Sequence, residues 1–476
     1  MKWVYLAIAI TCMVPLTGWL RNNPRQALKI WMVVGFLVIQ HGPLHVYMAM
    51  ISYPAWPGYI YGFEISLLDL ILLAIFFSRP RKQHFVPFKF AMGFYFLAIL
   101  LSAVPASVPN EVYFCAWQFA RVFFAYLVIS TACADDSRVP ILLLKGMAFG
   151  ILLATVEALW ERFGGGVLRT TGGFSHENFL GIVSHFAVFS FFALLLAGER
   201  GWLAPTVSLA GIVVAALTAS RATFAVAVFG YGVVFAASAW RGWNSRKAKI
   251  TAICLVATLA VSPLIISSFQ TRFQSDAADA FFGTDENRVA LVETARLMLA
   301  DHPMGIGANH FIVVANTQGY YSRAGVGWSN FRAIVHNAYW LVAAETGYIG
   351  ILAFMILLLN PLIVAFRCAW QHRRDRRDQR VDILLGLSVT LLTVYLHSLY
   401  EWVFVTFEVQ YMFAASVGLI AGLAQQLGYW KQIPIGAIQA QFTNPVRPAL
   451  GAPHKVAPLR MRKPHRHKQN DTFVSR

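Results

Sequence analysis

The sequence predicts an all-α polytopic membrane protein with about 12–13 transmembrane helices and one long, partly helical loop outside the membrane. Hydrophobic residues make up 58% of the 476 positions and charged residues only 13%, against about 25% charged in an ordinary soluble domain. The apolar residues form long blocks between short charged segments, as expected of helices that satisfy their own backbone hydrogen bonds inside a bilayer. All five cysteines lie in or beside these blocks, which predicts neither a disulfide framework nor a cysteine metal site.

The apolar blocks define thirteen candidate spans along the chain. They begin near Trp3, Ile30, Phe63, Phe88, Val112, Val139, Asn178, Trp202, Thr223, Ile250, Asn337, Asp382 and Val409. The first block has one leading lysine and no clear small-residue cleavage site before Arg21, which favours a first span over a signal peptide. The second block, from Ile30 to Met50, contains His41, Gly42 and Pro43, which would kink it.

The positions of lysine and arginine predict the orientation of the spans. Basic clusters follow the first, third, ninth, eleventh and last spans, and the eleventh loop, RCAWQHRRDRRDQR, alone holds six arginines. Each of these loops follows an odd-numbered span, so all of them are predicted to face the cytoplasm. Most of the net charge of +17 lies in these loops and in the tail, so it does not indicate a nucleic-acid partner.

These patterns divide the chain into four regions. They are spans 1–10 (residues 1–269), a long outer loop (270–335), spans 11–13 (336–430) and a basic tail (431–476) that is predicted to be disordered. The outer loop contains an amphipathic pattern from about Asn287 to Ala300, which predicts a helix that ends before Pro303. A folded loop of this length is expected to form a lid or wall over the membrane helices.

Four segments occur in a characteristic order in the second half of the chain. They read TGGFSHEN, LTASRATFAV, NRVALVETARLMLADHPMGIGANHF and HNAYWLVAAETGYIG. Together, over roughly residues 170–354, they resemble the bacterial O-antigen ligase and polymerase superfamily. Each segment alone is a weak match, whereas the ordered series is fairly specific.

The resemblance implies a function in surface polysaccharide biosynthesis. The expected reaction is transfer of a glycan from an undecaprenyl-pyrophosphate carrier to an acceptor hydroxyl at the periplasmic face of the bacterial inner membrane, with inversion. The acceptor stays open among lipid A-core, a growing polysaccharide and a protein, and membrane lipids are further partners. No metal, cofactor or nucleic acid is expected. A polymerase of the same superfamily is one alternative, and a transporter or flippase for a lipid-linked sugar is an alternative from another class.

Such a transfer requires a base for the acceptor hydroxyl and positive charge for the pyrophosphate. Histidine can accept a proton near neutral pH, and His336 stands at the outer start of the eleventh span. Arginine binds phosphate oxygens in pairs and keeps its charge, and Arg221 and Arg288 occupy matching segments on the outer side. The resemblance therefore implies that His336 is the general base and that Arg221 and Arg288 bind the pyrophosphate.

Other ionisable residues receive weaker expectations. Arg169 and Asn178 border the second outer loop and could line the site. Glu345 is a third residue that could line the site. It follows His336 by nine residues and would lie about 13 Å deeper along the helix, too far for direct proton transfer, so a supporting or packing role is expected. No Asp-x-Asp pair occurs in the chain, so no metal site is expected.

Several ionisable residues within the predicted spans are expected to have structural roles. Asp69 and Arg121 are predicted to form an ion pair, and His185 and His397 are predicted to form structural hydrogen bonds.

Overall fold

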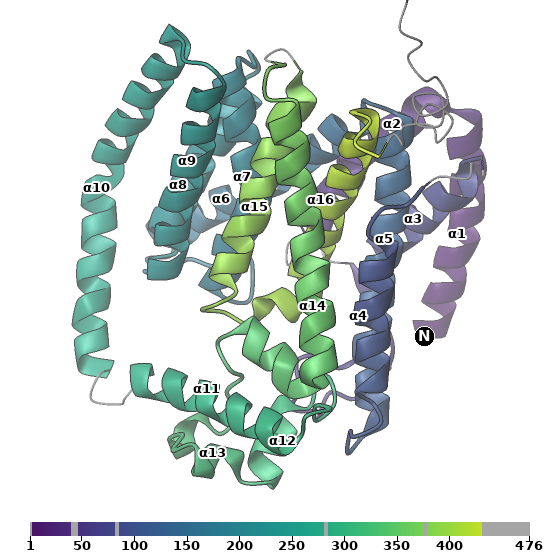
Figure 1. Cartoon of the computed structure of the whole chain (residues 1–476), viewed down its shortest axis with the longest axis vertical. Coiled ribbons are helices and arrows are strands. Elements are labelled where there is room, and N and C mark those ends of the chain that lie inside the picture. Colours follow the sequence, from purple (N-terminus) through teal and green to yellow (C-terminus); the bar gives the residue numbers. More distant parts are fainter. Residues whose placement is uncertain (1, 40–45, 81–84, 280–283, 376–377, 431–476) are drawn as a thin grey trace, which may run out of the picture. The chain divides into compact units, whose positions relative to one another are not determined.

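The computed structural model describes residues 2–39, 46–80, 85–279, 284–375 and 378–430. Each predicted span contains one helix (Figure 1). These helices are α1 (Lys2–Asn22), α2 (Pro24–Val38), α3 (Leu67–Ser78), α4 (Lys89–Leu101), α5 (Pro109–Asp135), α6 (Val139–Phe163), α7 (Glu177–Ala197), α8 (Leu203–Leu217), α9 (Arg221–Arg241), α10 (Ser245–Asp279), α14 (Ala338–Gln371), α15 (Gln379–His397) and α16 (Phe407–Gln426). The basic tail, residues 431–476, lies outside the described residues.

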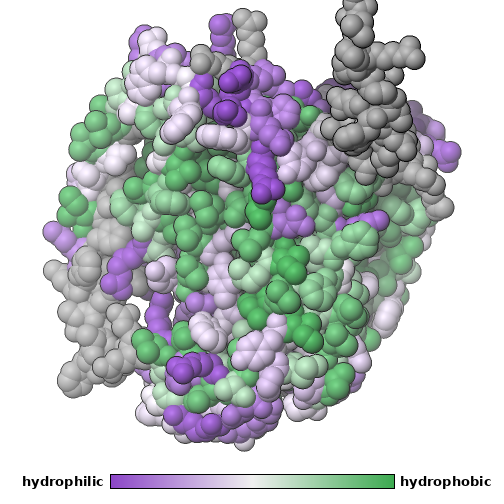
Figure 2. Space-filling view, viewed as in Figure 1, coloured by the Kyte–Doolittle hydropathy of each residue, from purple (hydrophilic) through white to green (hydrophobic). Residues whose placement is uncertain are grey.

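The prediction of an all-α polytopic membrane protein is confirmed. Among the described residues, eight helices are long and apolar enough to cross a membrane, namely α1, α5, α6, α7, α9, α14, α15 and α16. The helices α3, α4 and α8 are apolar but shorter. Hydrophobic residues cover the middle of the surface in Figure 2, and hydrophilic residues gather toward its two ends, as a bilayer requires.

One segment differs from the helical expectation. The chain forms a two-stranded antiparallel hairpin from β1 (Tyr47–Ser52) and β2 (Gly62–Ser66), where the second span was predicted to continue to Met50 and the third to begin at Phe63. The residues between the strands include Pro54, Pro57 and Gly58, which favour a turn and interrupt helix formation. The hairpin loop contributes contacts to the end of the bundle that holds His336.

The loops meet at two ends of the helical bundle, and contacts between them define each end. The loops that follow even-numbered spans meet at the end that holds His336, where the Ala308 N–H donates to the Ser102 hydroxyl oxygen at 3.1 Å. We call this the site end; it comprises the hairpin region 46–66 and the loops 102–108, 164–176, 218–220, 284–337 and 398–406. The loops that follow odd-numbered spans meet at the basic end, where Arg79 pairs with Asp135 at 2.5 Å. This alternation matches the arrangement that the basic loops predict.

The long outer loop is folded. Its first predicted residues, 270–279, belong to the end of α10, and the predicted amphipathic helix follows as the first helix of the outer region. The helices in this region are α11 (Thr284–Asp301), α12 (Phe311–Thr317) and α13 (Tyr320–Arg323), with a 3-10 turn at η3 (Trp328–Asn330). The predicted helix from Asn287 to Ala300 lies within α11. In Figure 1 these elements lie beyond the lower end of α14, where they cover part of the site end.

A break in α14 explains two glycine motifs of the outer region. The backbone of α14 is non-helical at Gly347, with φ of 68°, and this frees carbonyl groups of the preceding turn. The N–H groups of Ile306 and Gly307 donate to the carbonyl oxygens of Ala344 (3.1 Å) and Glu345 (2.9 Å). The approach is so close that a Cβ atom at Gly305 would lie 2.4 Å from the Glu345 carbonyl oxygen. The HPMGIG turn is therefore docked into the break.

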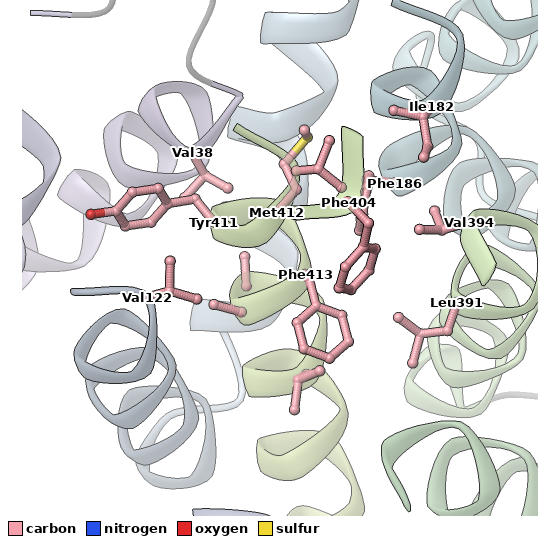
Figure 3. Close-up of a cluster of buried hydrophobic side chains, with 14 of the residues drawn as sticks. Val38, Val122, Ile182, Phe186, Leu391, Val394, Phe404, Tyr411, Met412 and Phe413 are labelled. Carbon is pink, nitrogen blue, oxygen red and sulfur yellow. The ribbon is translucent and has the colours of Figure 1, made fainter. Parts of the chain in front are cut away.

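The buried core of the bundle supports the site end. Tyr411, Met412 and Phe413 of α16 pack among apolar side chains of α2, α5, α7 and α15 (Figure 3). The predicted ion pair between Arg121 and Asp69 is confirmed at 2.8 Å, and the Tyr411 hydroxyl also donates to Asp69. Because interiors packed in this way resist deformation, α16 and the loop before it provide a fixed support for side chains at the site end.

Candidate functional site

His336 lies immediately before the N-cap of α14. Asn337 caps the helix, since its side-chain oxygen accepts from the N–H groups of Tyr339 (3.0 Å) and Trp340 (3.1 Å). The Asn337 side-chain amide donates to the Leu399 carbonyl oxygen at 3.0 Å, and this joins α14 to the loop 398–406. The His336 side chain is 31% exposed, so its ring is held against protein on one side and is accessible on the other.

Glu401 is the acidic partner of His336 and comes from the loop between α15 and α16. One carboxylate oxygen, Oε2, lies 3.3 Å from His336 Nδ1. The other, Oε1, accepts a hydrogen bond from the Asn178 side chain and lies 3.9 Å from a guanidinium nitrogen of Arg288. Glu401 is only 3% exposed, yet it is surrounded by donors. Four segments of the chain therefore meet at one carboxylate.

The surroundings of Glu401 favour its ionised form. Burial alone would raise the pKa of this carboxyl, but the hydrogen bond with His336 and the electrostatic attraction of the nearby basic groups outweigh burial and lower the pKa below its usual range. An ionised Glu401 accepts the proton on His336 Nδ1, and the opposite ring nitrogen, Nε2, is then the one that can accept a proton. This is the tautomer that a general base requires.

Arg288 belongs to the first turns of α11 and reaches Glu401 from the outer region. Its neighbour Asn287 accepts a hydrogen bond from the Gly327 N–H at 3.0 Å, which ties the start of α11 to the loop before η3. The Arg288 side chain is about half exposed, so its guanidinium contacts the carboxylate from the accessible side of the site.

The loop before α7 adds a second group of charged residues. Arg169 forms an ion pair with Glu177, and His176 Nε2 lies 3.5 Å from Glu177 Oε2. His176 also caps α7 by accepting from the Asn178 N–H at 3.2 Å. Its pKa is lowered, first by burial, while Glu401 acts in the opposite direction. Of the residues that were predicted to line the site, the two at this loop differ, because Asn178 contacts Glu401 whereas Arg169 is engaged by Glu177.

Arg221 is the first residue of α9 and lies at the site end. Ser220 caps this helix by accepting from the Thr223 N–H at 3.3 Å. The first turn of α9 packs against α7, since a Cβ atom at Gly181 would lie 2.2 Å from the Thr223 hydroxyl oxygen. Arg221 is therefore placed on the helix beside the one that supplies Asn178.

Glu345 belongs to a different hydrogen-bond network from His336. Its carboxylate accepts from the Tyr59 hydroxyl at 2.5 Å and from the Phe311 N–H at 3.1 Å. Phe311 is the first residue of α12, so Glu345 caps that helix and joins it to the hairpin loop and to α14. The structure gives Glu345 a supporting role for the outer region. The residue precedes the break at Gly347 by two positions in α14.

His185 and His397 form a buried pair that does not match its predicted role. Their ring centroids are 5.6 Å apart, and both residues are buried in the bundle. Within the described residues, neither ring nitrogen of His397 nor Nε2 of His185 has a hydrogen-bond partner. The prediction that both histidines make structural hydrogen bonds is therefore wrong for these three atoms, and the pair packs through its ring faces.

Sequence reasoning missed Glu401 and His176. Glu401 lies 65 residues after His336, within SLYEWVF, and no spacing rule joins two residues so far apart. The one available indication is that Glu401 is a charged residue between two apolar blocks, on the same predicted side as His336. His176 lies in the quoted segment TGGFSHEN, but its capping role depends on where α7 begins.

The fold and the site together define a polytopic membrane protein with an imidazole, a carboxylate and a guanidinium clustered at one end of its helical bundle. The family model described as "O-Antigen ligase" matches residues 206–355, which include Arg221, Arg288 and His336. The chain is also 21% identical over 350 residues to an "O-antigen polymerase" of Salmonella muenchen, covering 65% of this chain and 83% of that protein. Both comparisons support a relationship between this chain and the O-antigen ligase/polymerase superfamily.

Proposed function

We propose that this protein transfers a glycan from an undecaprenyl-pyrophosphate carrier to an acceptor hydroxyl at the periplasmic face of the bacterial inner membrane. The observation that carries the proposal is the cluster in which Glu401 joins His336 (3.3 Å) to Arg288 (3.9 Å). Glycosyl transfer from a pyrophosphate donor needs a base and a site for anionic charge next to each other, and this cluster supplies both kinds of group.

In the proposed reaction, His336 Nε2 takes the proton of the acceptor hydroxyl as its oxygen attacks the anomeric carbon of the donor sugar. The bond between that carbon and the pyrophosphate oxygen breaks, and the electron pair leaves with polyprenyl pyrophosphate. Attack from the side opposite the leaving group inverts the sugar configuration in one step. Glu401 keeps the Nδ1 proton directed toward itself and balances the positive charge that develops on the imidazole ring.

Arg288 and Arg221 are proposed to hold the pyrophosphate. A guanidinium group offers several N–H donors in a planar fork, so it can bind two phosphate oxygens at once. Together the two arginines can supply the positive charge that a divalent cation supplies in other glycosyltransferases. The carrier's lipid tail can then stay in the bilayer while its head group lies at the site end, and no cofactor is required.

Two members of the same class fit the site, a ligase and a polymerase. The family model carries the name of the ligase, and the Salmonella relative carries the name of the polymerase. The two differ in their acceptor, which is lipid A-core or a protein for a ligase and the growing polysaccharide for a polymerase. Deleting the gene separates them, because loss of attachment indicates a ligase whereas loss of chain length indicates a polymerase.

A transporter or flippase for a lipid-linked sugar is the alternative from another class. Such a protein would move the donor without breaking its anomeric bond. A reconstituted assay with lipid-linked donor therefore distinguishes the two functions, since only a transferase releases polyprenyl pyrophosphate in step with a new glycosidic bond.

Replacing Arg288 or Arg221 with lysine is expected to reduce transfer sharply at unchanged protein level. Lysine keeps the charge but loses the planar fork, so it binds the pyrophosphate as a single point charge. The measurement is the transfer rate with lipid-linked donor in reconstituted membranes. Arg296, an exposed arginine of the same helix α11 that pairs with Glu293, provides the control position for lysine substitution. Wild-type rates in both Arg221→Lys and Arg288→Lys would contradict the proposal that these two arginines hold the pyrophosphate.

Reporter fusions test the orientation that the proposal requires. Fusions after residues 85, 245, 375 and 460 are expected to report the cytoplasm, because the basic loops follow odd-numbered spans. A fusion near residue 315, within α12, is expected to report the periplasm. Paired reporters that are active on opposite sides of the membrane provide the measurement. A cytoplasmic signal near residue 315 would place the site in the cytoplasm and contradict the proposed periplasmic reaction.

A further inference from the structure

Trp328 is the most exposed large hydrophobic side chain among the described residues, at 86%. Other highly exposed aromatic residues lie on apolar helices; Trp240, for example, is 78% exposed on α9, a candidate membrane span. Lipid can cover such residues. Trp328 instead lies on the 3-10 turn η3 of the outer region, so no membrane helix accounts for its exposure. Tryptophan is enriched at binding surfaces because it combines a large apolar face with a polar N–H, so this side chain is a suitable contact for a ligand.

The loop that carries Trp328 is tied to the candidate site on its N-terminal side. Gly327 donates its N–H to the Asn287 side-chain oxygen at 3.0 Å, and Asn287 immediately precedes Arg288. The backbone of Trp328 therefore lies within one residue of a direct contact with the start of α11. This contact joins the turn that carries the indole to the start of α11, the helix of the arginine that is proposed to hold the pyrophosphate.

The C-terminal side of the same loop is also held firmly before it reaches His336. The Phe331 ring stacks on the Tyr321 ring with centroids 5.4 Å apart, and the Tyr321 hydroxyl donates to the Ala333 carbonyl oxygen at 2.6 Å. The Asn316 side chain donates to the Phe331 carbonyl oxygen, also at 2.6 Å. Because both sides are fixed, the exposed indole is presented on a rigid backbone, which lowers the entropy lost when a ligand binds.

We propose that Trp328 is the platform on which a pyranose ring of the substrate glycan stacks beside the transfer site. A pyranose has a face of C–H groups, which packs on the electron-rich face of an indole, and a rim of hydroxyl groups that stays solvated or hydrogen-bonded. Ser329 and Asn330 follow directly on η3 and offer polar groups to that rim. The inference rests on the proposed function, because it assigns the sugar to the donor or acceptor of the same reaction.

The test measures glycan binding by the full-length protein without turnover. The probe is the oligosaccharide released by mild acid from the cell's own lipid-linked pool, and binding is measured by saturation-transfer NMR in the His336→Ala background. Trp328→Ala is expected to weaken binding about tenfold, and Trp328→Tyr is expected to keep most of it because the aromatic face remains. Trp328→Leu is expected to behave like Trp328→Ala, and Trp240→Ala is the matched control with unchanged binding.

A membrane anchor is the competing role for an exposed tryptophan, and the same variants separate it. Brominated lipid quenches tryptophan that lies in the bilayer, so an anchoring Trp328 would contribute to the quenching, and the fraction of quenched fluorescence would fall in Trp328→Phe. That result, full binding in Trp328→Ala, or rescue by Trp328→Leu would overturn the proposal. In the transfer assay with His336 intact, Trp328→Ala should raise the KM for one substrate with kcat nearly unchanged, and the affected substrate identifies the sugar as donor or acceptor.

Failure of this inference is distinguishable from failure of the proposed function. If His336→Ala still transferred glycan, the assignment of the base would fail while the binding measurements on Trp328 would stand. If Trp328→Ala bound the oligosaccharide normally and His336→Ala were inactive, only the stacking platform would be rejected. Thermal melting of each variant controls for folding, since an exposed side chain should leave the melting temperature close to that of the wild type.

Discussion

Replacing His336 with alanine is expected to remove most glycan transfer, by about 10²–10⁴-fold, while expression and donor binding stay near normal. The alanine leaves the acceptor hydroxyl without a base, whereas the arginines and the rest of the site end are unchanged. The measurement is the rate against pH for purified enzyme in lipid. The wild type should lose activity on acidification, and the His336→Ala enzyme should lack this acid limb.

The position of Glu401 makes the acid limb interpretable. Because the pKa of Glu401 is lowered, this carboxyl stays ionised as the pH falls through the usual carboxyl range. An acid limb that the wild type shows at higher pH and the His336→Ala enzyme lacks is therefore not caused by protonation of Glu401. A His336→Ala enzyme with an unchanged rate and the same acid limb would exclude His336 as the general base.

Replacing Glu401 with glutamine is expected to reduce transfer by roughly 10²-fold or more, through His336 and without direct contact with the substrate. Glutamine can still accept from Asn178 through its amide oxygen. Its amide nitrogen would then face His336 Nδ1 as a donor, which forces the ring proton to Nε2 and leaves no lone pair for the acceptor hydroxyl. The measurements are kcat and the pH profile of the variant.

Two controls separate this positioning role from a merely structural one. Glu345→Gln changes another buried glutamate that caps α12, so it should affect melting temperature more than the shape of the pH profile. The double variant His336→Ala, Glu401→Gln should be little slower than His336→Ala alone, because both changes remove the same function. A Glu401→Gln enzyme with the wild-type pH profile and kcat would contradict the proposal that Glu401 acts through His336. Fully additive losses in the double variant would contradict it as well.

Composition and hydropathy were sufficient to predict the architecture. Apolar blocks the length of a bilayer can be buried only as helices, and the charges between the blocks select one of two orientations. These are local properties of the chain, so the helices and the alternation of loops between the two ends could be predicted. The hairpin at 47–66 was missed because short apolar runs do not distinguish a helix from a strand.

The sequence also named three residues that contact Glu401, namely His336, Arg288 and Asn178, together with Arg221 at the same end of the bundle. His336, Arg221 and Arg288 belong to ordered motifs, and each residue type matches a distinct requirement of the chemistry. Their local context, at a helix start or on an amphipathic outer helix, could be recognised within a short window. By the same reasoning Glu345 was counted with the site, since distance along a helix cannot show which network a buried carboxylate joins.

What the sequence by itself determined is therefore the membrane architecture, the alternation of its loops between two ends and the residue types available for the reaction. Only the tertiary structure decided that Glu401 is the partner of His336, because loops separated by 65 residues meet only when α14, α15 and α16 pack together. It also decided that Glu345 supports α12, because the break at Gly347 and the HPMGIG turn form one docked unit. Side-chain partners across a bundle depend on helix packing, and helix packing is not a local property of the chain.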